Sequence, residues 1–319
     1  MPLNVVIIGT GFGKYAVMPA FKYLGCHVQL VSPRDTEALN KALAEDCDLV
    51  SIHSPPFMHL QHVKIALDHG CHILCDKPFG RNADEAQEML TLAQDAGIHH
   101  FLNFEFRCDP QREKLKSLLE SGVIGEPLHL VYSTQLSHGR YMPHGWLFDK
   151  ELGGGWIGAF ASHIVDMLHW LFGEIEVVYA QTRIDARQHK GKDPSDKTLY
   201  QATAEDAVVA HFQMASGVTV NLDTSFAVAI NRPPEIILYG SEGAIELLPD
   251  RDVLLHRPGQ EPEKINLDKS EELMQLSMQR WLAQVITAIE EDQPLSPNFE
   301  TGLAVAKILD QMRAGVSGD

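Results

Sequence analysis

The chain begins with a short apolar strand that runs directly into a glycine-rich turn, VVIIGTGFG, at residues 5–13. The β-branched residues at positions 5–8 are typical of a central parallel strand that is buried on both faces. Gly9 and Gly11 allow the backbone to turn tightly and to approach a phosphate group without a Cβ in the way. Residues 14–23 are predicted to form a helix whose first N–H groups face that anion. Together these features predict a dinucleotide-binding unit.

The glycine spacing departs from the dinucleotide-binding fingerprint. The position of the third glycine is Lys14, and Gly13 comes one residue early. An ordinary strand–turn–helix is the alternative, but a strongly apolar strand directly before the turn favours a cofactor site. The turn supplies the first candidate cofactor-binding residues, which are Gly9, Thr10, Gly11, Phe12 and Gly13.

Length and charge narrow the class of protein. The chain has 319 residues, of which 45% are hydrophobic and 22% charged, and this suits two soluble domains. Every apolar run is interrupted before it could cross a bilayer, and the first residues form a strand rather than a cationic export signal. The formal net charge of −17 opposes binding to nucleic acid or to an anionic membrane. We therefore expect a cytoplasmic protein with a small-molecule substrate.

The cysteine content indicates reduced thiols. The five cysteines are an odd number, and all of them lie within the first 108 residues. Cys71 and Cys75, with His69 and His72 nearby, raise the alternative of a metal site. We expect no metal, because no second cluster completes such a site.

The first 122 residues alternate strands with helices. The strands are expected at residues 27–31, 49–53, 71–75 and 99–104. A helix over residues 82–96 begins at the cap Asn82, and Glu85 completes a capping pattern. Another helix ends near Gly122. Such alternation implies right-handed crossovers and a parallel sheet, so residues 1–122 are predicted to form an α/β Rossmann domain with a doubly wound parallel sheet.

The pattern changes after residue 125. Strands are expected at residues 128–136, 176–184, 207–214, 218–227, 235–239 and 244–248. Short Gly-containing turns join several of them, so the sheet is expected to be largely antiparallel. The other expected elements are a helix over 156–172, a loop over 187–197, and closing helices over 271–291 and 299–313. Residues 123–319 are predicted to form a C-terminal α+β domain with a large, mainly antiparallel sheet, and the last helix is expected to pack back on the first domain.

The segment LCDKP, residues 74–78, places Asp76 and Lys77 at the carboxyl end of a parallel strand. Ligands bind at that edge in open α/β sheets. A lysine there, desolvated and beside a cationic nicotinamide ring, could exchange a proton near neutral pH. A solvated lysine is the alternative, but Pro78 restrains the backbone directly after it and could be cis.

Five motifs in order carry a family resemblance: the glycine turn, HSPPFMH (residues 53–59), CDKP (75–78), FEFRCDP (104–110) and GGGWIGAFASHIVD (153–166). The closing NFETGLAVAKIL (298–309) extends it. With them, the chain resembles the glucose–fructose oxidoreductase, inositol dehydrogenase and rhizopine-catabolism family. The resemblance implies a Rossmann domain, a mainly antiparallel second domain, and NAD- or NADP-dependent chemistry at a hydroxyl carbon of a sugar, cyclitol or related compound.

The resemblance also implies roles for individual residues. Lys77 would hydrogen-bond the reacting oxygen, and Asp76 would contact the nicotinamide ribose. His163 would line the substrate and act as general acid or base, so Lys77 and His163 are the candidate catalytic residues. The further cofactor-binding candidates that the matched segments supply are His53, Ser54, Pro55, His59, Asn103 and Arg107.

One position departs from the family pattern. Sugar dehydrogenases of the family usually carry Asp four residues before the histidine, and here that residue is Ala159. Asp166 lies on an adjacent flank of the same helix, and Asp149 lies in the preceding loop, so either could replace the carboxylate. Carbonyl reduction or another substrate class therefore stays open.

The end of the second strand bears on the choice of cofactor. An NAD site usually places Asp or Glu there to bind the ribose 2′-hydroxyl. This chain has Ser32 and Arg34, a hydroxyl and a guanidinium that suit a 2′-phosphate. We therefore favour NADP over NAD. In the alternative, Arg34 is solvated and Asp35 contacts the ribose, which would fit NAD.

Residues 138–150, HGRYMPHGWLFDK, are rich in rings and polar groups that suit a sugar-like ligand. A loop packed on its own aromatic side chains is the alternative. The candidate substrate-binding residues are Lys77, Arg107, Trp146, Asp149, Trp156 and His163.

The leading hypothesis is an oxidoreductase that transfers hydride between a nicotinamide and a carbinol or carbonyl carbon. Two alternatives are a non-redox enzyme that uses bound NAD transiently and a catalytically silent, dinucleotide-sensing regulator. The open face of a large antiparallel sheet needs covering, so we expect a homodimer or homotetramer through the C-terminal sheet.

Overall fold

The computed structural model describes residues 2–270 and 272–315, and its contacts divide the chain into two compact units. Unit 1 draws on Met1–Asp109 and Glu271–Lys307, and unit 2 on Pro110–Ser270 and Ile308–Asp319. Both units thus take residues from two separate stretches of the chain. The expected domain boundary after residue 122 stays a prediction.

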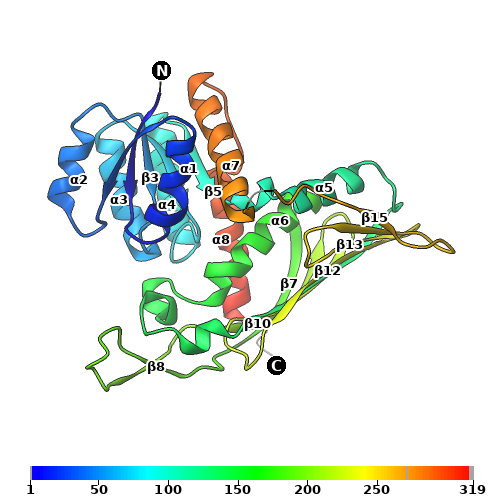
Figure 1. Cartoon of the computed structure of the whole chain (residues 1–319). Coiled ribbons are helices and arrows are strands. Elements are labelled where there is room, and N and C mark those ends of the chain that lie inside the picture. The colour runs from blue at the N-terminus through cyan, green and yellow to red at the C-terminus, as the bar shows by residue number, and fades with distance from the viewer. Residues whose placement is uncertain (1, 271, 316–319) are drawn as a thin grey trace. The chain divides into compact units, whose positions relative to one another are not determined.

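Unit 1 is built on a five-stranded parallel sheet (Figure 1). Its strands are β1 (Asn4–Ile8), β2 (His27–Val31), β3 (Leu49–Ile52), β4 (His72–Asp76) and β5 (His100–Asn103). Their order is β2-β1-β3-β4-β5, and every neighbouring pair is parallel. The Rossmann sheet expected from the alternating pattern is confirmed.

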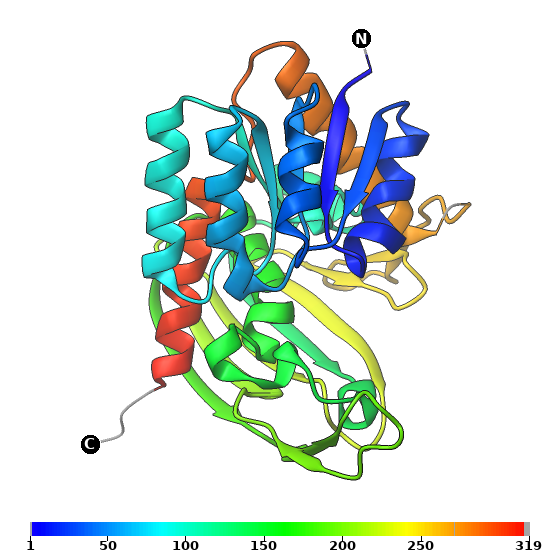
Figure 2. The same ribbon diagram turned by 90° about the vertical axis from the view of Figure 1, so that its left-hand side faces the viewer.

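Helices cover both faces of this sheet. The longer ones are α2 (Thr36–Leu43), α3 (His59–Asp68), α4 (Ala83–Ala96), α7 (Leu273–Glu290) and α8 (Phe299–Ala314). The shorter elements are a π-helix η1 (Gly13–Val17), which continues as the α-helix α1 (Met18–Tyr23). Two short 3-10 helices are η2 (Pro56–Met58) and η3 (Glu105–Cys108). Figure 2 shows α3 and α4 on the near face of the sheet and α7, in orange, behind it. The sheet is therefore doubly wound.

Helix α7 covers one face because its apolar side chains recur at helical spacing. Met278, Trp281, Leu282 and Val285 are all buried in one cluster with Phe21 of α1. This helix was expected from residue 271, which lies outside the described residues, and the structure begins it at Leu273.

The cap of α4 is the one that the sequence predicts. The Asn82 side chain accepts the N–H of Glu85 at 2.9 Å. The Glu85 carboxylate reaches back to the N–H of Arg81 at 2.9 Å. Both interactions satisfy N–H groups at the start of the helix.

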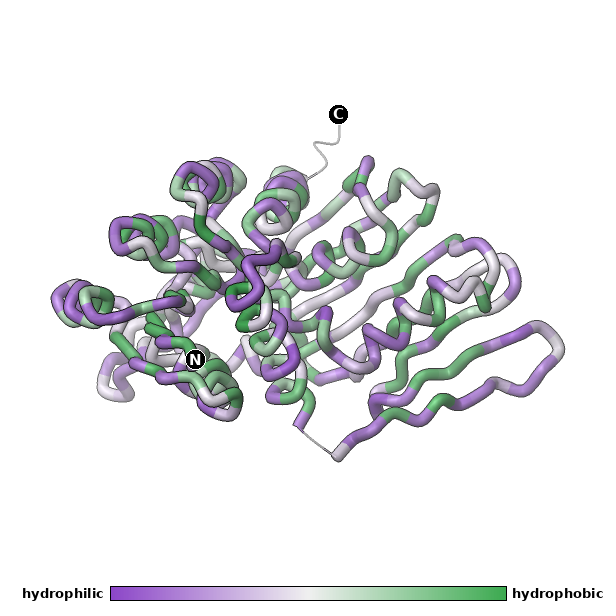
Figure 3. The backbone as a smooth tube through the Cα atoms, turned by 90° about the horizontal axis from the view of Figure 1, so that it is seen from above, coloured by the Kyte–Doolittle hydropathy of each residue, from purple (hydrophilic) through white to green (hydrophobic). Residues whose placement is uncertain are grey.

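Unit 2 holds an eight-stranded sheet in the order β15-β14-β13-β12-β6-β11-β10-β7. Its strands are β6 (Pro127–Gln135), β7 (Ile175–Arg183), β10 (Ala207–Met214), β11 (Thr219–Ser225), β12 (Arg232–Gly240), β13 (Ala244–Leu247), β14 (Val253–His256) and β15 (Glu263–Ile265). All pairs are antiparallel except β6 with β11. Figure 3 shows hydrophobic and hydrophilic residues alternating along its long strands. The expected, mainly antiparallel sheet is confirmed.

Four strands differ from the sequence-based expectation. The segment 187–197 was expected to be a loop, but β8 (Gln188–Lys190) begins there and pairs with β9 (Leu199–Gln201). The edge strands β14 and β15 were not predicted either. These strands have only three or four residues each, so they are too short to show a period-2 pattern.

The helices of unit 2 are α5 (Pro110–Glu120), α6 (Ser162–Phe172) and the last residues of α8. Three short 3-10 helices precede a π-helix η7 (Ile157–Ala161). They are η4 (His138–Tyr141), η5 (Trp146–Phe148) and η6 (Lys150–Leu152). The helix expected over residues 156–172 thus exists, but its first turn is wider than an α-helix. No helix in the described part of the chain is long and apolar enough to cross a bilayer.

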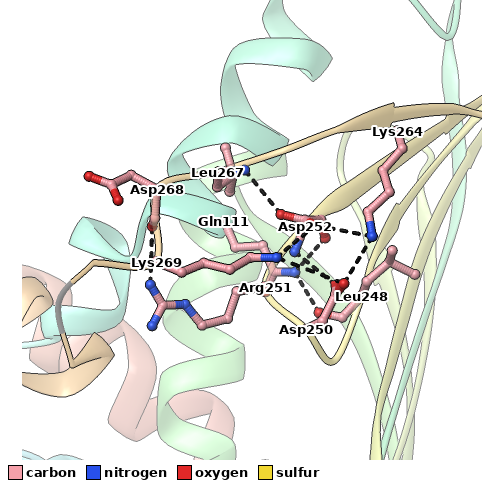
Figure 4. A network of polar contacts seen from close by, with 9 residues as sticks. All are labelled: Gln111, Leu248, Asp250, Arg251, Asp252, Lys264, Leu267, Asp268 and Lys269. Atoms are coloured by element: carbon pink, nitrogen blue, oxygen red, sulfur yellow. Dashed lines mark hydrogen bonds and ion pairs between the residues drawn. The ribbon is translucent and has the colours of Figure 1, made fainter.

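A network of charged and polar side chains stabilises the edge of the large sheet (Figure 4). The Asp252 carboxylate, 2% exposed, accepts the N–H of Leu267 at 3.0 Å and lies 3.1 Å from Lys264 Nζ and 2.7 Å from Lys269 Nζ. The side chain of Gln111, in α5, donates to the carbonyl of Asp252 at 2.8 Å. The hydrogen bond from Lys269 and those from Leu267 and Lys264 outweigh burial and hold the pKa of Asp252 well below its usual range.

We expect Asp252→Asn to lower the urea midpoint of unfolding at pH 7, because it removes the charge that the two lysines share. A carboxylate with a lowered folded-state pKa stabilises the fold above its unfolded pKa of about 3.9 and loses this effect as pH falls. The difference between the two proteins should therefore shrink between about pH 5 and pH 2. Glu261→Gln, an exposed change in the turn between β14 and β15, is the control. Equal midpoints of Asp252→Asn and wild type at pH 7 would contradict the expectation.

Candidate functional site

The carboxyl ends of β1, β3, β4 and β5 bring candidate residues to one edge of the parallel sheet. Ile8 pairs with Ile52, and Asp76 pairs with Asn103. The residues that follow these strands therefore gather at the edge where open α/β sheets bind ligands. This is the arrangement that the sequence predicts for the cofactor site.

The three glycines of the first turn have different tasks. Gly9 has φ +146°, and a Cβ on it would lie 2.6 Å from the carbonyl oxygen of His53. A Cβ on Gly13 would lie 3.0 Å from Ile7 Cγ2, so Gly13 allows η1 to pack against β1. Gly11 is exposed, and a Cβ there would meet open space. Gly13 thus supplies the close packing that the fingerprint assigns to a third glycine.

The geometry of this turn fits a dinucleotide. Thr10 and Gly11 are exposed at its tip, and Phe12 is half-buried beside His53, with ring centroids 5.9 Å apart. The backbone at Gly11 has room for a large group to approach, which is what a pyrophosphate requires.

Asp76 is buried and accepts hydrogen bonds on both oxygens. Oδ1 accepts the N–H of Lys77 at 2.9 Å and Nδ2 of Asn103 at 3.3 Å. Oδ2 lies 3.1 Å from Nδ1 of His53. Burial would raise the pKa of Asp76, but the hydrogen bond and charge of His53 and the charge of Lys77 outweigh it, and the pKa is lowered. Asp76 is therefore an ionised carboxylate inside the protein.

Lys77 directly follows this carboxylate and is half-buried. The peptide bond between Lys77 and Pro78 is cis. The segment thus places a lysine at the carboxyl edge of the sheet, next to a negative charge.

Two further buried histidines join the loops of this edge. Nε2 of His59 lies 2.8 Å from the carbonyl oxygen of Ser54, and Nδ1 lies 3.3 Å from that of Phe79. His62 lies 2.9 Å from Ser54 Oγ and 3.1 Å from the carbonyl oxygen of Pro33. Burial lowers the pKa of His62 to about 4, so its ring is neutral at physiological pH. The sequence-based candidates missed His62, although it lies one turn after His59 on α3.

The turn after β2 holds the candidates for cofactor choice. Ser32 and Arg34 are both exposed, and the N–H of Arg34 donates to Ser32 Oγ at 3.4 Å. Oδ1 of Asp35 accepts the N–H of Ala38 at 2.9 Å and caps α2. Asp35 therefore has a structural task of its own in this turn.

Two other candidate cofactor-binding residues of unit 1 are only half-buried. Pro55 is half-buried at the start of η2. Arg107 is half-buried in η3, and its Nη1 donates to Ser296 Oγ at 3.3 Å.

In unit 2, close backbone contacts fix the segment that leads to His163. A Cβ on Gly154 would overlap the carbonyl oxygens of Trp146, Leu147 and Asp149. The N–H of Gly154 donates to the carbonyl of Asp149 at 2.9 Å. Only glycine fits here, so the ring-rich segment 138–150 lies directly against the backbone that leads into η7.

His163 lies in the first turn of α6, and its side chain is almost fully buried. Asp166 is also buried in α6, and Ala159 is half-buried in η7. Asp149 is half-buried, and its Oδ1 accepts the N–H of Glu151 at 3.0 Å, so this oxygen caps η6.

Glu205 is a half-buried residue whose side chain is 10% exposed, and the sequence-based candidates missed it. It accepts the N–H of Ile157 at 3.2 Å and lies 3.9 Å from Arg313 Nε. Burial raises the pKa of Glu205 despite the charge of Arg313. No sequence motif marks it, because its partners come from η7 and α8.

Aromatic side chains of the segment 138–150 and of Trp156 are packed on rings of unit 2. Trp156 is stacked between Phe160 and Phe226, at centroid distances of 4.7 and 4.3 Å, and its indole N–H donates to Thr224. Phe148 is stacked on His189 at 3.7 Å. Trp146 is half-buried. The substrate-binding roles of Trp146 and Trp156 stay predictions, and the structure gives Trp156 a packing role.

Two family models match the chain and together cover more than half of it. Residues 27–104 match the oxidoreductase family with an NAD-binding Rossmann fold, and residues 113–246 match the GFO/IDH/MocA C-terminal domain. The chain therefore belongs to the GFO/IDH/MocA family and is an NAD(P)-dependent oxidoreductase.

Named relatives agree with this assignment. An uncharacterized oxidoreductase of Synechocystis sp. is 28% identical, over 91% of this chain and 85% of its own length. Levoglucosan dehydrogenase of Pseudarthrobacter phenanthrenivorans is also 28% identical, over 76% of this chain and 73% of its own. The solved structure of levoglucosan dehydrogenase with NADH and levoglucosan superposes with a TM-score of 0.87 at 20% identity, over 99% of this chain and 97% of that one, which shows a shared fold.

Proposed function

We propose that this protein transfers hydride between a nicotinamide dinucleotide and a hydroxyl or carbonyl carbon of a sugar, cyclitol or related small molecule. The observation that carries the proposal is the Asp76–Lys77–Pro78 segment at the carboxyl edge of the sheet, on the same edge as an open glycine turn. The dehydrogenase name of a relative that acts on levoglucosan supports the substrate class.

The glycine turn, Lys77 and His163 have separate tasks in this proposal. The bound nicotinamide supplies or accepts the hydride. The exposed backbone around Gly11 binds the pyrophosphate. Lys77 holds the reacting oxygen and gives it a proton in reduction or removes one in oxidation. His163 is a second group that can hold or move that proton.

Screening with purified protein tests the proposal. Turnover of a sugar, cyclitol, aldehyde or ketone, followed by nicotinamide absorbance, would support it. Dinucleotide binding without turnover of any such compound would contradict it and select a regulator.

We also propose that the cofactor is NADP. Ser32 and Arg34 are exposed in the turn after β2, whereas an oxygen of Asp35 caps a helix. A guanidinium can bind a 2′-phosphate in a fork, while a carboxylate is needed to favour the 2′-hydroxyl of NAD.

Arg34→Ala should weaken NADPH binding roughly 10- to 100-fold, because it removes a charge-assisted hydrogen bond. NADH binding should change less than about threefold. Titration of nicotinamide fluorescence with both cofactors measures the two dissociation constants. Lys41→Ala, which removes an exposed cation from α2, is the matched control. A preference for NADH that Arg34→Ala leaves unchanged would overturn the assignment of NADP.

We also propose that the protein self-associates through the large sheet of unit 2. Tyr179, Val209 and Tyr239 are exposed on β7, β10 and β12, and apolar side chains on a sheet face mark interaction surfaces. We propose a homodimer or homotetramer that covers this face.

A further inference from the structure

Asp76 is the last of a row of three buried side chains, after Ser51 and His53. Ser51, in β3, is 0% exposed, and its Oγ lies 2.7 Å from Nε2 of His53. Nδ1 of His53 lies 3.1 Å from Oδ2 of Asp76, the last residue of the neighbouring strand β4. The side chain of His53 is 0% exposed. Ser51 and His53 are therefore closed off from solvent, while the Asp76 side chain is 12% exposed.

The charge of Asp76 fixes the direction of one hydrogen bond in this row. Asp76 is ionised, so Nδ1 of His53 must carry the proton that it donates to Oδ2. Nε2 of His53 and Oγ of Ser51 form the second hydrogen bond of the row. This bond holds the ring in place and polarises the hydrogen bond to Asp76.

This order of groups resembles the nucleophile–base–acid arrangement of hydrolases, but the burial rules out that use. A nucleophile must meet its substrate, and both the Ser51 hydroxyl and the His53 ring are closed off from solvent. His53 was a candidate cofactor-binding residue, and its buried ring leaves only its backbone for such a contact. The row must act through Asp76.

Asp76 connects the row to the cofactor edge. Its other oxygen, Oδ1, accepts the N–H of Lys77 and the side-chain amide of Asn103. If the donor on Oδ2 is lost, the carboxylate can rotate about χ2, and the positive charge of Lys77, which already helps to lower the pKa of Asp76, attracts it. A freed carboxylate beside an ammonium group pairs with it.

We propose that His53, backed by Ser51, is a positioning residue that holds the Asp76 carboxylate on its internal donors and so keeps it from binding the Lys77 ammonium group. This inference rests on the proposed role of Lys77 in proton transfer. It assigns Asp76 an internal task, in place of the ribose contact that the family resemblance implies.

Two substitutions at His53 separate its two hydrogen bonds. The amide nitrogen of Asn falls near the place of Nδ1, so His53→Asn keeps a donor for Asp76 and loses Ser51. The amide of Gln falls near the place of Nε2, so His53→Gln keeps a partner for Ser51 and loses Asp76. We expect His53→Gln to lower kcat roughly 10- to 100-fold and His53→Asn to lower it less than about threefold. The dissociation constant of the dinucleotide should change less than about threefold in both.

The reactivity of Lys77 gives a readout that needs no substrate. Acetic anhydride acetylates lysines in their neutral form, and peptide mass spectrometry can compare Lys77 with the exposed Lys22 of the same molecule. We expect the acetylation rate of Lys77 relative to Lys22 to fall at least about threefold in His53→Gln and to stay near that of wild type in His53→Asn. Ser51→Ala should produce a smaller fall in the same direction, and it carries the test if a His53 variant does not fold.

The outcomes are distinguishable. If the wild-type protein turns over no substrate, the proposed function is wrong. The order of the Lys77 acetylation rates in the variants still tests this inference in that case. Equal kcat and equal acetylation in His53→Asn and His53→Gln would overturn it. A loss confined to dinucleotide affinity would also overturn it, because Asp76 would then act as a ribose ligand.

Discussion

Lys77→Met is expected to lower kcat by about 100- to 10,000-fold, the range typical of losing a general acid or base. Methionine has a similar length and keeps the apolar stem, so the fold around the cis peptide bond should persist. Dinucleotide affinity should change little, since the glycine turn is untouched. Stopped-flow and steady-state absorbance of the nicotinamide measure the rate, and fluorescence titration measures the affinity.

A matched control separates this effect from the general loss of a surface cation. Lys22→Met changes an exposed lysine of α1 in the same unit and should leave kcat within about twofold of wild type. If Lys77→Met retains more than about a tenth of the wild-type kcat, the proton is handled elsewhere, and His163 becomes the leading candidate.

Gly9→Ala is expected to destabilise the protein by about 3 kcal/mol or more. The new Cβ would lie 2.6 Å from the carbonyl oxygen of His53, at a backbone φ of +146° that side chains rarely adopt. The carbonyl belongs to the backbone directly after β3, which cannot move without disturbing the sheet. Urea unfolding at pH 7 measures the change, and the variant should bind dinucleotide poorly.

Gly11→Ala is the variant with which Gly9→Ala should be compared. A Cβ on Gly11 meets open space, so stability should change by less than about 0.5 kcal/mol. Dinucleotide affinity should nevertheless fall about tenfold, because the methyl group occupies the approach of the pyrophosphate. Equal losses of stability in the two variants would contradict the separate tasks assigned to these glycines.

The fold could be predicted where the sequence carries long, regular signals. The strand before Gly9 and the cap at Asn82 each predict an element that the structure contains, and so does the sequence of the long closing helix. The two π-helices at Gly13–Val17 and Ile157–Ala161 were not predictable, because one extra residue per turn leaves no mark on hydrophobic periodicity.

Some residues of the candidate site could be predicted from the sequence, and others could not. Glycines, the lysine–proline pair and the motif histidine stand out by residue type and position. Ser51, His62 and Glu205 do not, because each owes its place to partners that are distant in sequence. A serine in an apolar strand gives no sign of the imidazole that it contacts. Such supporting groups become visible only when strands and helices are assembled.

The divided make-up of unit 1 has a consequence for how this chain emerges from the ribosome. Trp281, Met278 and Leu282 of α7 bury the same cluster as Val5 and Phe21. Until about residue 290 has been synthesised, that apolar face has no cover, and exposed surface of this kind invites aggregation. A fragment that stops at residue 122 would lack α7, so the cofactor-binding unit cannot be isolated by a single cut. A newly made chain depends on a helix in its last quarter to complete the core of its first third.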